Sequence, residues 1–523
     1  MKKLLLISLI SAALASCSSR TGHLTGVLVR PLYFPEVPQG MVYIPAGAYN
    51  MGENDQDVPF VHQTRAKTVS VQAMYMDNTE ISNNEYRQFV NWVRDSIARD
   101  FIYLNKDGRT SNYENVEWTD DDAKEWINYQ ELYFDEATYE YVAYDPSDRD
   151  LGRSLFNLNW DKEINYEDPK LVPLLADMYY VSAERFFKRK EIDTRKLIYK
   201  YYWVDLIEAA KRGRINIVTD GYAGGDKDPL HRELDTPEHP ITHDPQGQDK
   251  DMGWYNKKGQ NNAIRGHKDR QRFIIDEKIM VYPDTLCWIR DFTYSFHDPM
   301  TQMYFWHPAY DNYPVVGVTW LQAKAFSIWR TQLLNSWLTS MGEIFVNDFR
   351  LPTEAEWERG SRGGLDLAQY PWGGPYNRNE GGCFLGNFKP MRGRYFDDGG
   401  FHTVKVYSYN PNGWGLFCMA GNVSEWCETA FDESMNEFSH DINTDFRYNA
   451  MDWDPPSMKR KVLRGGSWKD IGYYMQNSTR TFEYQDSAKS YVGFRNVMTH
   501  LGRGGRDFTK EGGEETQGDI LLR

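Results

Sequence analysis

Residues 350–358 read RLPTEAEWE. Within this stretch Thr353 is followed three residues later by Glu356, which is the pattern of a capping box. In a capping box the hydroxyl accepts a hydrogen bond from the amide of the third helical residue, and the glutamate reaches back to the amide of the capping residue. The stretch therefore predicts a helix that begins directly after residues 350–352.

The same capping signal occurs at residues 82–85 (SNNE) and 319–322 (TWLQ). Each is followed by apolar side chains at helical spacing, so each predicts a helix with one buried face. Residues 41–52 are typical of a strand, a Pro/Gly turn and a second strand, and residues 69–71 indicate another short strand. Capped helices between short strands indicate an α+β fold with few long elements.

Residues 101–300 differ from the flanking parts of the chain because they are rich in charge and tyrosine and have little periodicity. Leucine, isoleucine and tyrosine spacing predicts one helix at residues 194–212. Residues 221–259 are rich in Asp, Gly, Pro and His and are predicted to be largely loop. Aromatic residues of this region are candidates for protein contacts: Trp126, Tyr129, Tyr133, Tyr139, Tyr141, Trp160, Tyr202 and Trp203.

The overall composition is acidic, with a formal net charge of -15. This balance argues against nucleic acid as a partner and against a basic membrane-facing patch. Downstream of the N-terminal segment no stretch reaches the roughly 18 apolar residues that a membrane helix needs. Besides Cys17 the chain has four cysteines, whose number leaves both disulfides and free thiols open: Cys287, Cys383, Cys418 and Cys427.

The N-terminus combines Lys2 and Lys3 with the apolar stretch 4–14, which is the pattern of a secretory signal. Small residues then precede Cys17, and this sequence resembles a bacterial lipobox. We therefore expect cleavage after residue 16 and acylation of Cys17, which would tether a body of 507 residues (523 minus 16) to a membrane.

Several motifs together resemble the formylglycine-generating-enzyme/sulfatase-modifying family. They are MVYIP to MG (41–52), EISNNEY (80–86), YPVVGVTW (313–320), RLPTEAEWE (350–358), GL to GNVSEW (415–426), LRGGSW (463–468) and GFR (493–495). The resemblance implies an irregular α+β fold related to the C-type lectin fold, with residues 101–300 as a large insertion.

This resemblance and the composition divide the chain into six parts. They are a signal peptide (1–16), a lipid-anchored linker (17–40), the first part of the family domain (41–100), the insertion (101–300), the second part of the domain (301–500) and a flexible tail (501–523).

The copper-dependent oxidases of this family have two thiolates a few residues apart after the Gly-Gly-Ser block, because soft sulfur ligands select Cu(I). The matching positions here are Asp470 and Met475, and no cysteine follows Cys427. The resemblance therefore implies a degenerate site, with no catalytic residue and no required cofactor. A related branch holds iron with three histidines, but His239 and His243 are better explained as parts of a solvated loop.

The resemblance also implies structural calcium, which is bound by hard oxygen ligands. A first site would use Asn387, the carbonyl of Phe388 and Asp398; an ordinary Asp-Gly turn is the alternative explanation for that carboxylate. A second site would use the side chain at Cys418, the carbonyls of Gly421 and Val423, and Glu425. A thiol at Cys418 is a poor calcium ligand.

A lipobox, a degenerate domain and a long insertion together resemble the K-type ring lipoproteins (PorK/GldK) of the type IX secretion and gliding machinery. That resemblance implies an outer-membrane lipoprotein facing the periplasm. Its partners would be further copies of itself, an N-type periplasmic subunit (PorN/GldN), other type IX secretion components and, through lipid, the outer membrane. The alternatives are a sulfatase-modifying-type metalloenzyme with an altered metal site, and a glycan-binding lipoprotein.

Overall fold

The computed structural model describes residues 37–53, 66–104, 125–128, 132–135, 140–143, 157–204, 274–295, 297–391, 396, 400–450 and 454–501. Cys17 and Asp398 lie outside these residues, as do the expected signal peptide and nearly all of the expected tail. The described chain mixes helices with several small sheets, so the predicted α+β class is confirmed.

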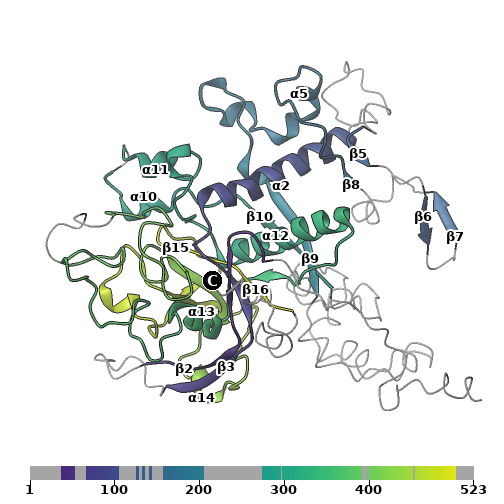
Figure 1. The fold of residues 1–523 in the computed structure, drawn as a ribbon. Helices are drawn as coiled ribbons and strands as arrows, with labels where there is room; N and C mark the ends of the chain where they lie inside the picture. Colours follow the sequence, from purple (N-terminus) through teal and green to yellow (C-terminus); the bar gives the residue numbers. More distant parts are fainter. Residues whose placement is uncertain are drawn as a thin grey trace, which may run out of the picture.

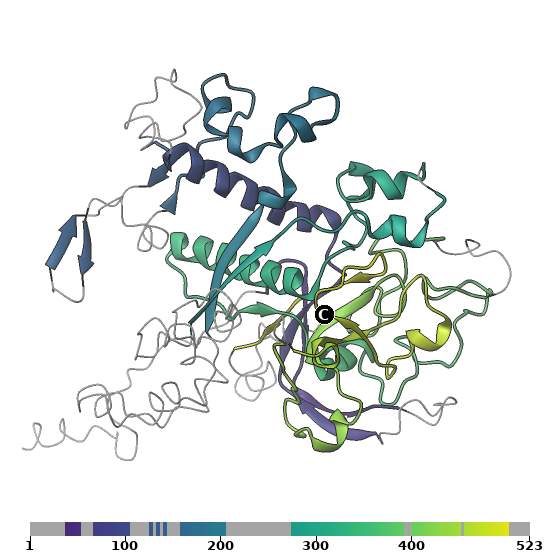
Figure 2. The same cartoon turned by 180° about the vertical axis from the view of Figure 1, so that it is seen from behind.

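Two four-stranded sheets form the centre of the structure (Figure 1, and from behind in Figure 2). The first contains β1 (Met41–Ile44), β4 (Met74–Asp77), β16 (Val497–Thr499) and β11 (Phe349–Arg350), in that order and all antiparallel. The second contains β14 (Thr481–Tyr484), β13 (Arg460–Arg464), β12 (Ser424–Ala430) and β15 (Val492–Gly493), with β12 and β15 parallel.

Two-stranded ribbons complete the described β structure. They are β2 (Gly47–Met51) with β3 (Lys67–Val71), β5 (Ile127–Asn128) with β8 (Asn157–Leu158), β6 (Leu132–Asp135) with β7 (Glu140–Ala143), and β9 (Ile198–Val204) with β10 (Ile274–Met280). The strands predicted at residues 41–52 and 69–71 are confirmed as β1, β2 and β3.

The three helices predicted from capping boxes are all present: α2 (Asn83–Leu104), α12 (Trp320–Met341) and α13 (Glu354–Ser361). The capping residues of α12 and α13 make both reciprocal hydrogen bonds, and the serine that precedes α2 makes the same pair with its glutamate. Four shorter helices are α5 (Leu171–Leu174), α10 (Cys287–Asp291), α11 (Pro299–Met303) and α14 (Met435–Phe438).

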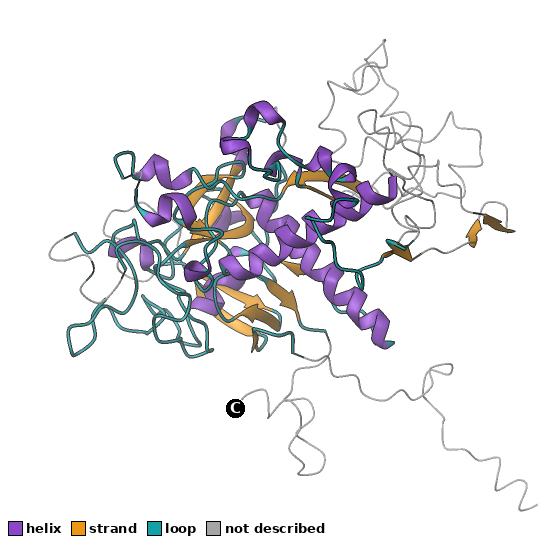
Figure 3. Cartoon of the chain, turned by 90° about the horizontal axis from the view of Figure 1, so that it is seen from above, coloured by secondary structure: helices purple, strands orange, loops and turns teal. Residues whose placement is uncertain are grey.

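The main core lies between α2 and α12, which contact each other and are drawn among the purple helices seen from above in Figure 3. The ring of Tyr86 on α2 stacks on Phe326 of α12 at 5.7 Å, and Phe89 packs edge-on against the same phenylalanine. The β9–β10 ribbon crosses both helices, with the hydroxyl of Tyr199 donating to Gln332 on α12 at 2.6 Å. Residues on both sides of the undescribed segment 205–273 therefore belong to this core.

The helix predicted at residues 194–212 is wrong over residues 194–204, and residues 205–212 lie outside the described part of the chain. After a single 3-10 turn the chain forms strand β9, and its side chains alternate between buried and exposed. Tyr199 and Tyr201 face the core, whereas Tyr202 and Val204 face outward. Aromatic and β-branched residues favour a strand when one face is buried, and here packing against α12 outweighs the helical spacing.

No helix within the described residues is long and apolar enough to cross a membrane. The four cysteines that the structure describes are free thiols, of which three are buried and Cys383 is exposed.

Candidate functional site

The candidate site follows strand β13, where Gly465 and Gly466 turn the chain. Both glycines have positive φ values, of 91° and 66°. A Cβ on Gly466 would lie 2.7 Å from the carbonyl oxygen of Tyr474, so the turn needs a residue without a side chain. The turn leads into residues 467–476, which contain the positions of the expected thiolates.

Asp470 holds this loop in place through hydrogen bonds. Its carboxylate accepts from the hydroxyl of Ser467 at 2.5 Å, and its amide donates to the Ser467 carbonyl. Its own carbonyl accepts from the amide of Lys389 at 2.8 Å. Burial raises the pKa of the Asp470 carboxyl. The side chain thus closes a small turn, and the backbone carbonyl ties that turn to a neighbouring loop.

Met475 lies in an apolar cluster rather than beside Asp470's polar contacts. Its side chain is 1% exposed and packs with Tyr370, Phe388 and Ala420. A thioether in such surroundings fills space between irregular loops, which is a common use of methionine in cores.

The described residues do not fit a copper site of the thiolate type. No group of three His, Cys, Asp or Glu side chains among them is placed to hold a metal ion. Burial is the main cause that raises the pKa of the thiols of Cys287, Cys418 and Cys427, which keeps them protonated. The soft anionic ligands that select Cu(I) are therefore missing from this part of the chain.

The first predicted calcium set is only partly described. The side-chain NH2 group of Asn387 donates to the backbone carbonyl of His402 at 2.7 Å, and the backbone carbonyl of Asn387 accepts from the amide of Asn422 at 2.9 Å. Phe388 follows in the same loop, whereas Asp398 lies outside the described residues. The first site therefore stays a prediction.

The second calcium set does not fit a cation. Both carboxylate oxygens of Glu425 accept from Arg495 at 2.6 Å, and one of them also accepts from the indole of Trp357 at 2.7 Å. The thiol of Cys418 donates to the carbonyl of Val406. Both oxygens of this carboxylate are therefore already bound by an arginine, and the thiol is a poor calcium ligand.

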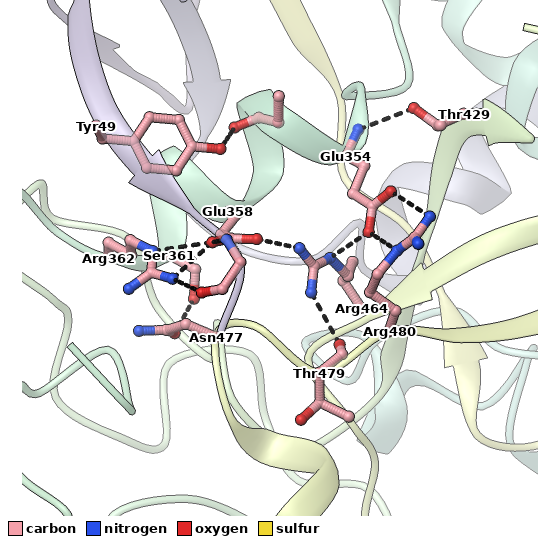
Figure 4. Close-up of polar contacts among 12 residues, drawn as sticks. Tyr49, Glu354, Glu358, Ser361, Arg362, Thr429, Arg464, Asn477, Thr479 and Arg480 are labelled. Atoms are coloured by element: carbon pink, nitrogen blue, oxygen red, sulfur yellow. Dashed lines mark hydrogen bonds and ion pairs between the residues drawn. The ribbon is translucent and has the colours of Figure 1, made fainter. Parts of the chain in front are cut away.

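The stretch RLPTEAEWE forms a buried ion network with strands β13 and β14 (Figure 4). Arg464 forms ion pairs with both Glu354 and Glu358, and none of these three side chains is exposed. Arg480 donates twice to Glu354, at 2.5 and 2.9 Å, and Arg362 pairs with Glu358 at 2.6 Å. These side chains therefore join α13 to the second sheet and leave no carboxylate for chemistry.

The face beside the loop is covered by α10 and the residues that follow it. Trp288 and Phe292 stack on Trp468 with ring centroids 5.9 and 5.8 Å apart. The carboxylate of Asp291 pairs with Lys469 at 2.5 Å and accepts from the hydroxyl of Ser490. This segment, which precedes residue 300, therefore packs directly on the loop that carries Asp470.

Sequence reasoning placed Asp470 and Met475 in one loop but missed the ion network. Local spacing explains the capping boxes, yet it does not show which arginine meets which glutamate when 106 to 126 residues separate them. The available signal was the presence of Arg464, Glu354 and Glu358 within stretches that otherwise resemble core segments.

Comparison with known proteins gives one clear family. The model of the sulfatase-modifying factor enzyme 1-like domain (FGE-sulfatase) matches residues 33–141 and 265–500. A formylglycine-generating enzyme of Thermomonospora curvata is 34% identical over 191 residues, which cover 35% of this chain and 55% of that protein. The inactive C-alpha-formylglycine-generating enzyme 2 of Bos taurus is also 34% identical over 191 residues, covering 35% and 50%.

The chain spans about half the length of these two relatives. Active and inactive proteins match it equally well, so sequence identity does not distinguish between them. Among solved structures, PvdO from Pseudomonas aeruginosa matches at 12% identity and a TM-score of 0.38, covering 88% of this chain and 94% of its own.

Proposed function

Because the chain belongs to the family of sulfatase-modifying factor enzyme 1-like domains, we propose that it is a non-catalytic member of that family. One observation carries this proposal: the two positions expected to hold thiolates are used for packing. Asp470 bonds to Ser467 within its own turn, and Met475 is buried among aromatic rings. An acid and a thioether in these roles cannot supply the two thiolates that activate oxygen on Cu(I).

The test is to measure copper and iron in the purified full chain and to follow oxygen uptake with a cysteine-containing peptide. We expect no stoichiometric redox metal and no uptake above that of a heat-unfolded sample. Stoichiometric metal with turnover would instead support the metalloenzyme with an altered site. Restoring both thiolates, with Asp470→Cys and Met475→Cys together, would show whether the surrounding loop still accepts copper.

The proposed role is structural: an outer-membrane lipoprotein that assembles with an N-type subunit (PorN/GldN) into a periplasmic ring of the type IX secretion and gliding machinery. Three features support it. The lipobox ending at Cys17 supports a lipid tether, the degenerate loop supports a role without catalysis, and the motifs resemble those of the K-type ring lipoproteins. Heterologous contacts that close would generate the ring.

Exposed aromatic residues support contacts between proteins. Of the aromatic candidates, Trp160 and Tyr202 are 41% and 61% exposed, whereas Trp126 is buried. The last turns of α12 add Trp337 and Met341, which are 53% and 65% exposed. Exposed rings of this kind are enriched at the centres of interfaces.

Electron microscopy of the protein purified from membranes, with whatever copurifies, tests this role. We expect ring-shaped particles that contain a second, non-acylated subunit. Cys17→Ala should release a folded body into the soluble periplasmic fraction and remove rings from the envelope. Particles that stay monomeric at every concentration would contradict the structural role without reviving an enzymatic one.

A further inference from the structure

Residues 185–190 read RFFKRK and form an exposed turn that the function proposed above does not use. We call Phe186, Phe187, Lys188, Arg189 and Lys190 the basic-aromatic tip. Phe186 is 74% exposed and Phe187 is 91% exposed, and the three cationic residues that follow are exposed as well. The tip belongs to the segment that stands with α5 above α2 in Figure 1.

The backbone of the tip is strained at the two residues in its middle. Phe187 and Lys188 have positive φ values of 51° and 59°, although neither is a glycine. Two successive large residues in the left-handed region are costly, and such outliers persist where the surrounding structure holds them. Arg185 holds the start of the turn in place, because its guanidinium donates to the backbone carbonyl of Tyr180 at 2.6 Å.

The charge of the tip opposes the charge of the chain. The molecule carries a net charge of -15, and composition alone predicted that it has no basic membrane-facing patch. Here three exposed cations adjoin two exposed phenylalanines. Of the neighbouring acids, Glu184 already pairs with Arg195 at 2.6 Å, and Glu191 is exposed just beyond the tip.

We propose that the basic-aromatic tip inserts into the interface of a membrane that contains anionic phospholipids. Adjacent phenylalanines can enter the boundary between headgroups and acyl chains, while the flanking lysines and arginine meet headgroup phosphates. The rings and the cations lie together on one exposed turn, and a bilayer can receive both without a preformed pocket. The proposal depends neither on ring assembly nor on acylation of Cys17.

The test uses the chain from residue 17 onward with Cys17→Ser, which keeps every described residue and removes the site of acylation. Cosedimentation is measured with vesicles of phosphatidylcholine alone and with vesicles of phosphatidylcholine and phosphatidylglycerol in equal amounts. We expect binding to the anionic vesicles only, and binding that weakens as salt is added.

Two sets of variants separate the contributions of the rings and of the charges. Phe186→Ser with Phe187→Ser should lower partitioning at least about tenfold. Lys188→Glu and Arg189→Glu should each lower it about fivefold or more. The matched controls are Tyr294→Ser, an aromatic side chain that is 97% exposed, and Lys170→Glu, an exposed lysine elsewhere on the surface. Both controls should bind like the parent chain.

Equal melting temperatures for all variants would show that the exposed substitutions leave the fold intact. Failure of the parent chain to bind anionic vesicles would overturn the proposal, as would binding that the phenylalanine variants do not reduce. If the substitutions in the tip disrupt self-association but leave vesicle binding unchanged, the tip is a contact between proteins. The membrane proposal would then be wrong.

Discussion

Arg464 and Asp470 lie six positions apart on either side of the Gly465–Gly466 turn, yet they belong to two contrasting regions. On one side, Arg464 joins a fully buried network with two glutamates of α13. On the other, the loop holds an acid and a thioether where related oxidases hold thiolates. Under the proposed non-catalytic role, the family motifs of this chain report the fold and not the chemistry.

The physical reason is that the two regions respond differently to substitution. A buried network of charges is weakened strongly when one member is lost, because the remaining charges lose part of their compensation in a low-dielectric interior. A ligand position on a loop can accept any residue that packs, once metal binding is no longer required. Fold motifs can therefore persist around a site whose donors have been replaced.

The largest expected effect is that of Arg464→Met, which would leave Glu354 and Glu358 without their shared partner. We expect a loss of about 3–5 kcal/mol in the free energy of unfolding, measured by urea denaturation. The matched control is Arg290→Met, because that side chain is 64% exposed and pairs with Asp284 at 3.2 Å. Its loss should stay below about 1 kcal/mol; equal effects of the two substitutions would undermine the comparison.

Met475→Ala should cost about 2–5 kcal/mol, because it opens a cavity among buried rings. Met475→Leu keeps the volume and should cost less than about 1.5 kcal/mol. Met341→Ala provides the exposed control, with an expected change of about 0.5 kcal/mol or less. If the leucine variant retained stability but lost a metal-dependent signal, Met475 would be a ligand rather than a packing residue.

Gly466→Ala tests the turn that separates the two regions. The new Cβ would lie 2.7 Å from the Tyr474 carbonyl at a residue with positive φ, so we expect a cost of about 2 kcal/mol or more. Gly342 also has positive φ but has open space around it. Gly342→Ala should therefore cost only the backbone strain, about 1 kcal/mol in the free energy of unfolding. Thermal or urea unfolding measures both variants, and the difference between their losses of stability gives the cost of the close contact at Gly466.

The smallest expected effect is that of Asp470→Asn, and it depends on pH. Burial raises the pKa of the Asp470 carboxyl, so the folded state binds this proton more tightly than the unfolded state. The resulting stability is fully present below the unfolded pKa, near 3.8, and is lost as pH rises through the higher folded pKa. Asparagine does not titrate, so the stability of the variant does not fall in this way as the pH rises.

Urea midpoints of the parent chain and the Asp470→Asn variant, recorded from acidic to neutral pH, provide the measurement. The parent should lose stability relative to the variant as the pH rises across this window. Parallel profiles would mean that folding does not raise the pKa of this carboxyl.

Sequence reasoning was most accurate where structure depends on neighbouring residues. The three capping boxes predicted α2, α12 and α13 because their hydrogen bonds join residues three positions apart. It was wrong at residues 198–204, where packing against α12 favours a strand over the predicted helix. It also missed the basic-aromatic tip, because a net charge of -15 conceals a local cluster of opposite sign.

The order of strands in the first sheet has a consequence for how the chain matures. Strand β4 pairs with β1 on one edge and with β16 on the other, and Asp77 beside β16 bonds to a residue 419 positions away. Loop closure over such a distance delays assembly. A polypeptide that is synthesised or exported from its N-terminus must therefore keep the β4 edge unpaired until its final strand arrives. During that interval the edge is open to aggregation, which makes it a natural point for a holdase chaperone to act.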